Sequence, residues 1–146
     1  MRHGLRILVP YKDGDNWSIR GVVNPSKEER TAAKAALAQA REGITVGGVK
    51  YFPEAGLLGG GKHGLSWTEG PARAKDTGNP QGKFGSVADV NYAAQQASTL
   101  GPRKDGTFPL PAGHSCIMYM PDGSTGKPTQ VFVKVYESGK VHAYPL

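Results

Sequence analysis

The chain contains a single cysteine, Cys116, so it can form no intrachain disulfide and no cysteine-rich metal site. Because Cys116 lies in an apolar run, we expect a buried structural thiol rather than a nucleophile. The sequence also lacks any apolar stretch of the roughly 20 residues that a membrane-spanning helix needs, and it shows no signal peptide. These absences predict a soluble domain that can act in a reducing cytosol.

Metal-ligand patterns are missing as well. The four histidines, His3, His63, His114 and His142, show no local spacing typical of metal ligands. No His-x-Glu or Cys-x-x-Cys motif accompanies them, and a zinc deaminase would need both. The sequence therefore predicts neither a metal centre nor another cofactor.

Glycine and positive charge are abundant instead. The 21 glycines and 11 prolines make 32 of the 146 residues, which is below the roughly 25–30% typical of disordered chains and predicts a loop-rich globular domain. Lys plus Arg outnumber Asp plus Glu by 18 to 12, giving a net charge of +6 and a pI near 9.5. The basic residues form no continuous run. This charge favours a polyanionic partner such as nucleic acid, with ordinary solubility charge as the alternative.

Two segments have the pattern of capped helices. Ser26 and Glu29 have capping-box spacing at the start of the first, and Ser86 and Asp89 form a similar pair at the start of the second. Apolar residues follow each pair with helical periodicity. The first helix is expected to end at Gly43.

Strand-like segments dominate the last third of the chain. The clearest is residues 130–136, and residues 140–144 are its hairpin partner. Residues 66–85 have no clear period and predict a long, basic, turn-rich loop. Further strands are predicted at residues 5–11, 107–110 and 116–120, and a strand pair or one bulged strand at 44–52. With helices first and an antiparallel sheet last, this order predicts an α+β fold.

The loop between the last two strands contains Gly139 and allows two registers. A two-residue loop sets Val135 opposite His142, whereas a three-residue loop with a left-handed Gly139 sets Lys134 opposite His142. The second register sorts the residues better, because it separates an apolar face from an aromatic and cationic one. The aromatic and cationic face would carry Phe132, Lys134, Tyr136, His142 and Tyr144. Such a face suits base stacking and phosphate binding, and it equally suits ordinary cross-strand packing.

The segment GLLGGGKHG, residues 56–64, surrounds Lys62 and His63 with glycine. It matches the start of a phosphate-binding loop, but His63 stands where that motif needs Ser or Thr to bind Mg²⁺. A flexible hinge is a second interpretation. In a third, the glycines let the backbone approach a phosphodiester and expose the Lys-His pair to it.

The third interpretation leads to a metal-free mechanism of RNA cleavage. His63 and His142 would be the general acid and base, in an order that the sequence does not assign. Lys62 and Lys134 would stabilise the charge of the phosphorane.

Other side chains would hold the RNA in place. Thr129 and Tyr144 would position the scissile phosphate. The predicted basic loop offers three RNA-binding residues, Trp67, Arg73 and Lys83.

Several short segments resemble the C-terminal toxin domains of bacterial polymorphic toxins, including those used in contact-dependent growth inhibition. In chain order they are GKHGLSWTEGPARA, NPQGKFGS, FPLPAGHS, MPDGS and SGKVHAYPL, within residues 61–146. The resemblance implies a barnase/EndoU/colicin/RelE-like fold, in which N-terminal helices pack on a C-terminal twisted antiparallel sheet. It also implies a metal-independent ribonuclease, often one that cuts tRNA. The group shares no single catalytic motif, so the residue roles given above depend on chemistry alone.

The same resemblance implies a biological setting. We expect one toxin domain over residues 1–146, with a nuclease core at 51–146 and an accessory or delivery segment at 1–50. The domain would be the C-terminal part of a larger secreted or cell-surface protein and would act in the cytoplasm of a target cell. A small immunity protein would block it, and the net charge of +6 predicts that this partner is acidic.

Two other functions stay open. A small α+β domain could instead attack NAD⁺, as a glycohydrolase or an ADP-ribosyltransferase, with Glu54 or Glu69 as the required carboxylate. A non-enzymatic module would bind RNA or a partner protein with a steep salt dependence and no turnover.

Overall fold

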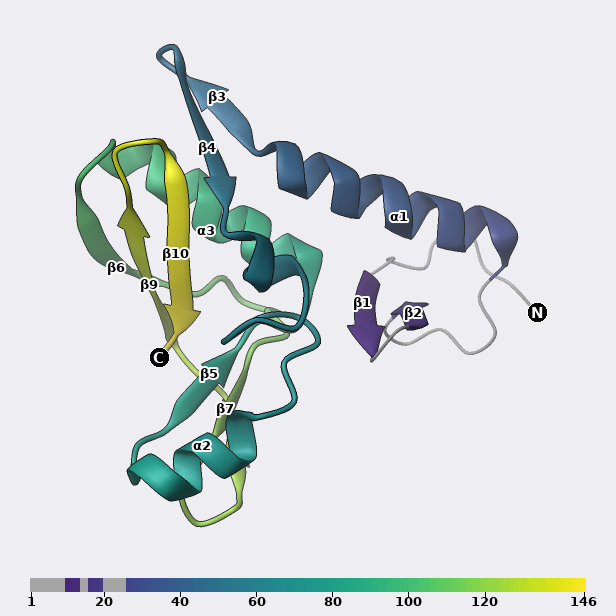
Figure 1. The fold of residues 1–146 in the computed structure, drawn as a ribbon, viewed down its shortest axis with the longest axis vertical. Helices are drawn as coiled ribbons and strands as arrows, with labels where there is room; N and C mark the ends of the chain where they lie inside the picture. The colour runs from purple at the N-terminus through teal and green to yellow at the C-terminus, as the bar shows by residue number, and fades with distance from the viewer. Residues whose placement is uncertain (1–9, 14–15, 20–25) are drawn as a thin grey trace.

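The computed structural model describes residues 10–13, 16–19 and 26–146 (Figure 1). In the N-terminal part, β1 (Pro10–Asp13) pairs antiparallel with β2 (Asn16–Ile19). Residues 5–9 of the strand predicted at 5–11 lie outside the described residues, and so does His3.

Both predicted helices are confirmed. α1 (Lys27–Glu42) begins with the capping box of Ser26 and Glu29, and α3 (Val87–Leu100) begins at Ser86, whose hydroxyl oxygen accepts a backbone hydrogen bond. These caps satisfy N–H groups that have no partner within the helix, so the local sequence fixes both starting points. None of the described helices is long and apolar enough to cross a membrane.

The central sheet has five strands in the order β3-β4-β10-β9-β6 (Figure 1). These strands are β3 (Ile44–Val46), β4 (Val49–Pro53), β6 (Asp105–Pro109), β9 (Gln130–Val135) and β10 (Lys140–Pro145). All neighbours are antiparallel except β4 and β10, which are parallel. The α+β class is therefore confirmed, with the difference that the sheet is mixed rather than purely antiparallel.

Residues 44–53 supply two strands of this sheet. β3 and β4 form a hairpin through Gly47 and Gly48, whose φ angles of 58° and 79° suit a two-residue turn of the I′ kind. β4 then lies beside β10, where Glu54 N donates to Val141 O at 2.9 Å. Residue 50, the predicted boundary between the accessory segment and the nuclease core, lies within β4.

The hairpin of β9 and β10 has the register with Lys134 opposite His142. Gly139 N donates to Tyr136 O at 2.9 Å, and Gly139 has a φ of 90°, as the three-residue loop requires. The predicted faces follow from this register. The buried face carries Val131, Val133, Val135, Val141 and Ala143, each at most 1% exposed.

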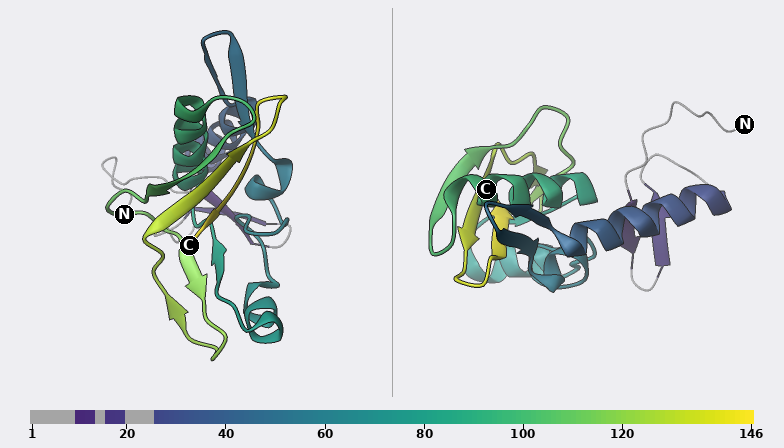
Figure 2. Two further views of the ribbon diagram at one scale, coloured as in Figure 1. Left: turned by 90° about the vertical axis from the view of Figure 1, so that its left-hand side faces the viewer. Right: turned by 90° about the horizontal axis from the view of Figure 1, so that it is seen from above.

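α3 covers the buried face of the central sheet, and α1 packs beside α3 (Figure 2). α1 contributes Leu37 and Ala40 to the same core, and Leu57 and Phe84 enter it from the connecting segments. The opposite face of the β9–β10 hairpin is only partly covered. Its aromatic and imidazole side chains are therefore available to build a site.

A second, smaller sheet extends from the main body next to α2 (Figure 1). It consists of β5 (Gln81–Lys83), β7 (Ile117–Tyr119) and β8 (Thr125–Gly126), with α2 (Gly70–Thr77) alongside. The prediction of a structureless loop at 66–85 is therefore wrong. α2 buries only Gly70 and Ala74, so it has no apolar face long enough to give a helical period.

Candidate active site

The glycine segment forms a compact loop in which backbone packs on backbone. A Cβ on Gly61 would lie 2.6 Å from Gly56 Cα, and a Cβ on Gly64 would lie 2.0 Å from Gly56 O. Leu65 N also donates to Leu57 O at 3.1 Å, which closes the loop. The glycines are thus required for close packing, which argues against the hinge interpretation.

The same loop differs from a phosphate-binding loop. Several of its N–H groups already donate to backbone carbonyls: those of Gly59 and Gly61 to Gly56 O, and that of Gly64 to Gly61 O. A phosphate-binding loop instead directs its N–H groups at the ligand and leads into a helix. Here α2 begins only at Gly70.

His63 emerges from this loop into the protein interior. Its φ of 69° is unusual for a residue with a side chain, and it is only 6% exposed. Its Nδ1 lies 2.7 Å from Gly82 O on β5. Since a carbonyl oxygen only accepts, Nδ1 carries the proton and donates it. Nε2 is then the ring nitrogen with a free lone pair, and no described residue bonds to it.

The surroundings of His63 disfavour its charged form. Burial, assisted by the charges of Lys62, His142 and Arg73, lowers the pKa of His63 from 6.5 to about 4. The hydrogen bond to Gly82 opposes this shift without cancelling it. At neutral pH His63 is therefore a neutral imidazole that can accept a proton.

His142 comes from β10 and is held by a carboxylate. Its Nδ1 lies 3.0 Å from Glu54 Oε2, and both side chains are 30% exposed. Glu54 follows directly after β4, so the parallel pairing of β4 with β10 brings the two residues together. The sequence indicated Glu54 only as a carboxylate for an attack on NAD⁺, because this strand pairing has no local signal.

Tyr144 joins the two imidazoles. Its ring stacks on His63 with the centroids 5.0 Å apart at 28°, and it meets the edge of His142 at 5.9 Å. Phe132 packs against Tyr144 at 5.1 Å. The two histidines, 79 positions apart in a chain of 146 residues, therefore belong to one cluster.

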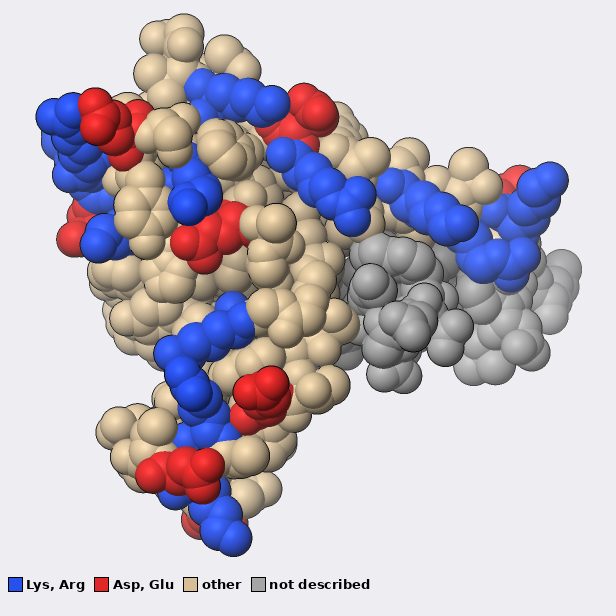
Figure 3. All heavy atoms as spheres, viewed as in Figure 1, with Lys and Arg blue, Asp and Glu red and all other residues tan. Residues whose placement is uncertain are grey.

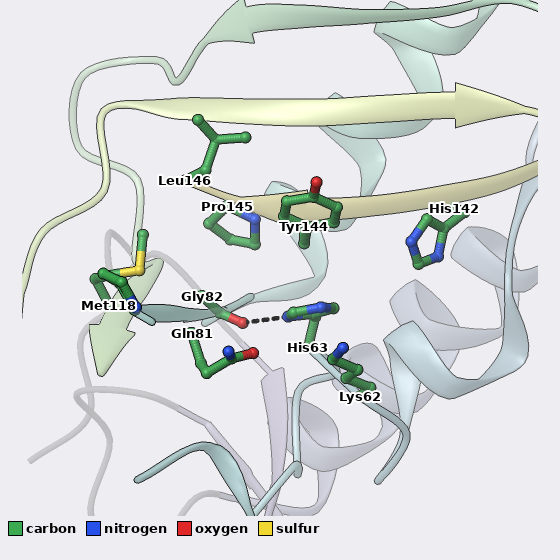
Figure 4. Close-up of a pocket in the computed structure, with 10 residues that line it drawn as sticks. Lys62, His63, Gln81, Gly82, Met118, His142, Tyr144, Pro145 and Leu146 are labelled. Carbon is green, nitrogen blue, oxygen red and sulfur yellow. Dashed lines mark hydrogen bonds between the residues drawn. The ribbon is translucent and has the colours of Figure 1, made fainter. Parts of the chain in front are cut away.

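A pocket of about 480 Å³ opens beside this cluster, between the central sheet and the small sheet (Figure 4). Figure 4 shows Lys62, His63 and His142 together on one side of it. Lys62 is exposed, and no described carboxylate pairs with it. The full lining is Lys62, His63, Pro80, Gln81, Gly82, Met118, His142, Tyr144, Pro145 and Leu146.

Five of the predicted site residues do not line this pocket, namely Trp67, Arg73, Lys83, Thr129 and Lys134. Lys134 is the cross-strand neighbour of His142, but its Nζ lies over the Tyr136 ring, 5.5 Å from the centroid. Thr129 lines a separate pocket of about 340 Å³ with His114. Trp67 is 4% exposed and packs against His63 at 5.3 Å, so its buried ring has no open face for a base.

The two predicted RNA-binding cations lie on the elements beside the pocket. Arg73 is exposed on α2, close enough for its charge to act on His63, and Lys83 is partly buried on β5. Elsewhere, basic side chains are interspersed with acidic ones, and a row of them follows α1 (Figure 3). On this face the charge is therefore mixed, and the charges of Lys62 and Arg73 are close enough to act on His63.

Cys116 is a buried structural thiol, as predicted. It is 4% exposed, and burial beside Asp89 raises the pKa of the thiol far above its usual value. His114 Nδ1 accepts the Cys116 N–H at 3.1 Å, so this histidine serves the start of β7.

Among the described residues, no group of three His, Cys, Asp or Glu side chains is placed to hold a metal ion. No protein-family model, curated protein or solved structure matches the chain. What the site can do therefore follows from its own geometry.

Proposed function

We propose that this protein is a metal-independent endoribonuclease that cleaves RNA by transesterification through the 2′-hydroxyl. The observation that supports this most is the pair of imidazoles on one pocket wall, joined by Tyr144 and accompanied by Lys62. The reaction needs a base, an acid and a cation near the phosphate, and this wall offers all three.

His63 suits the role of general base. Its lowered pKa of about 4 keeps it neutral at physiological pH, and its donation to Gly82 O leaves Nε2 as the acceptor. His63 would take the proton from the 2′-hydroxyl, whose oxygen then attacks the adjacent phosphorus. The Gly82 contact fixes the tautomer and the orientation of the ring.

His142 suits the role of general acid. Its Nδ1 donates to the Glu54 carboxylate, which orients the ring, and in the protonated ring Nε2–H is left to act on the substrate. His142 would give that proton to the 5′-oxygen as the P–O5′ bond breaks. Lys62, with Arg73 nearby, would stabilise the extra negative charge of the phosphorane.

The attack on NAD⁺ receives less support. Its first candidate carboxylate, Glu54, is engaged by His142, and its second, Glu69, is exposed and lies outside the pocket lining. The toxin setting, a tRNA substrate, action in a target-cell cytoplasm and an acidic immunity protein stay proposals that derive from the sequence resemblance. The net charge of +6 is compatible with them.

The decisive test is incubation of the purified protein with total bacterial RNA in EDTA, followed by a denaturing gel. We expect discrete fragments, and loss of at least about 100-fold of the cleavage rate in His63→Gln and His142→Gln. His114→Gln is the matched control, because His114 lines a different pocket, and it should cleave normally. Intact RNA with folded wild-type protein, or full activity in both pocket variants, would overturn the proposal.

A further inference from the structure

The pocket has two chemically different ends. Lys62, His63 and His142 occupy one end, and Met118, Pro145 and Leu146 occupy the other (Figure 4). The cationic end suits a phosphate, whereas the opposite end offers apolar contact surface. A volume of about 480 Å³ is within the range of sites that enclose a small ligand such as a nucleotide.

The apolar end is a well-built part of the fold. Gly82 on β5 packs directly on β10, because a Cβ there would lie 2.1 Å from Pro145 O. Met118 is the cross-strand partner of Gly82, which places it beside the end of β10. The two sheets are therefore in direct contact at this end of the pocket.

Gln81 lies between the two ends and has unused hydrogen-bonding capacity. Its Nε2 makes only long contacts, at 3.5 Å to Thr77 Oγ1 and 3.5 Å to Asn79 O. No described residue donates to its Oε1, which leaves a free acceptor on the pocket wall. An amide acceptor of this kind recognises the exocyclic amino group of a base.

The aromatic rings of the site are not available for base stacking. Tyr144 has His63 at 5.0 Å and Phe132 at 5.1 Å, and Trp67 is buried. A base bound here would instead contact the side chains of Met118 and Pro145. The protein would then recognise the base through hydrogen bonds to its edge rather than by stacking on its face.

We infer that the Met118 end of the pocket is a nucleobase subsite, in which Gln81 Oε1 accepts a hydrogen bond from the amino group of adenine or cytosine. The adjoining phosphate would lie at Lys62, His63 and His142. This inference rests on the proposed function and adds to it a preference for the base at the cleavage site.

The test is an NMR titration of the whole protein with adenosine, cytidine and uridine 3′-monophosphates and with inorganic phosphate. We expect all four to shift signals at Lys62 and His63, and the adenine and cytosine nucleotides to bind about 3- to 10-fold more tightly than the uracil nucleotide. Gln81→Leu should abolish this difference. Gln81→Glu, which keeps the acceptor, should retain the order, and a loss of the order there would overturn the role of Oε1.

RNA cleavage measured in parallel separates the two ideas. Equal binding of all nucleotides, in a protein that still cleaves RNA, would overturn the base subsite alone. Absence of both phosphate binding and cleavage in the wild type would overturn the subsite and the proposed function together.

Discussion

At the scale of single residues, His63 combines three properties that are each unfavourable in free energy. It has a left-handed backbone, it is buried, and its ionisation is suppressed. A non-glycine residue in this region of φ costs on the order of 1 kcal/mol, and such residues concentrate at functional sites. The close packing of the glycines around it holds this conformation in place.

The suppressed ionisation of His63 makes stability depend on pH. Because its pKa falls from 6.5 in the unfolded chain to about 4 in the folded protein, the unfolded chain binds the extra proton between these values. The stabilisation is fully present above pH 6.5 and is lost as the pH falls towards 4, by up to about 3 kcal/mol.

His63→Gln removes the titrating group but keeps an amide that can donate to Gly82 O. We expect its free energy of unfolding to depend less on pH than that of the wild type between pH 6.5 and about 4. Urea denaturation of both proteins across this range measures the difference. The same pH dependence of the free energy of unfolding in both proteins would show that His63 does not cause it.

Glu54 is expected to act through His142. Glu54→Gln keeps a hydrogen-bond acceptor but removes the charge that strengthens the hydrogen bond orienting His142, so kcat for RNA cleavage should fall about 10- to 100-fold with little change in KM. Glu69→Gln is the matched control, because Glu69 is exposed and makes no side-chain cap of α2. A similar fall in both variants, or a change confined to KM, would contradict the positioning role.

At the scale of elements, the β9–β10 hairpin depends on Gly139 in two ways. Its φ of 90° requires glycine, and a Cβ would also meet Lys50 O of β4 at 2.0 Å. The residue thus sets the register of the hairpin and permits the parallel strand to approach. The register positions His142 on β10, and the approach of β4 positions Glu54 beside it.

These two effects can be separated experimentally. Gly123 has a φ of 89° with open space around its Cβ position, so Gly123→Ala reports backbone strain alone, at about 1 kcal/mol. Gly139→Ala should be destabilised by at least about 2 kcal/mol more, because the clash with β4 adds to the strain. Thermal and urea denaturation of the two variants measure this. Equal destabilisation of the two variants would show that β4 can shift away from the added methyl group without loss of stability.

At the scale of the whole molecule, the chain carries a net charge of +6, and on the face shown in Figure 3 the basic side chains lie among acidic ones. General attraction to RNA should therefore come from many residues, and productive binding from the few at the pocket. Lys62 lines the pocket, whereas Lys34 is exposed on α1, which extends away from the central sheet in Figure 2.

Salt dependence distinguishes these contributions. We expect affinity for an uncleavable RNA oligonucleotide to fall steeply with salt, and Lys62→Gln to reduce the slope of log K against log salt by about 1. Lys34→Gln removes the same charge and should change the slope less. Fluorescence anisotropy over a salt series measures both. Identical slopes would indicate that the RNA does not favour the pocket.

The sequence by itself determined the elements that depend on neighbouring residues. The caps at Ser26 and Ser86 fixed two helices, and Gly139 fixed a hairpin register that places His142 opposite Lys134. Each rests on hydrogen bonds or backbone angles within a few residues, which is why pattern and spacing predict them. Lys62, His63, His142 and Tyr144, named from the sequence, line one pocket, and their catalytic roles stay predictions.

Only the tertiary structure decided how that pocket is built. The parallel pairing of β4 with β10 brings Glu54 to His142, and the small sheet brings Gly82 to His63 and Gln81 to the pocket wall. Tertiary packing also buries Trp67, and the burial of His63 lowers its pKa. These outcomes depend on contacts between segments far apart in the chain and on the exclusion of water, which no short stretch of sequence encodes.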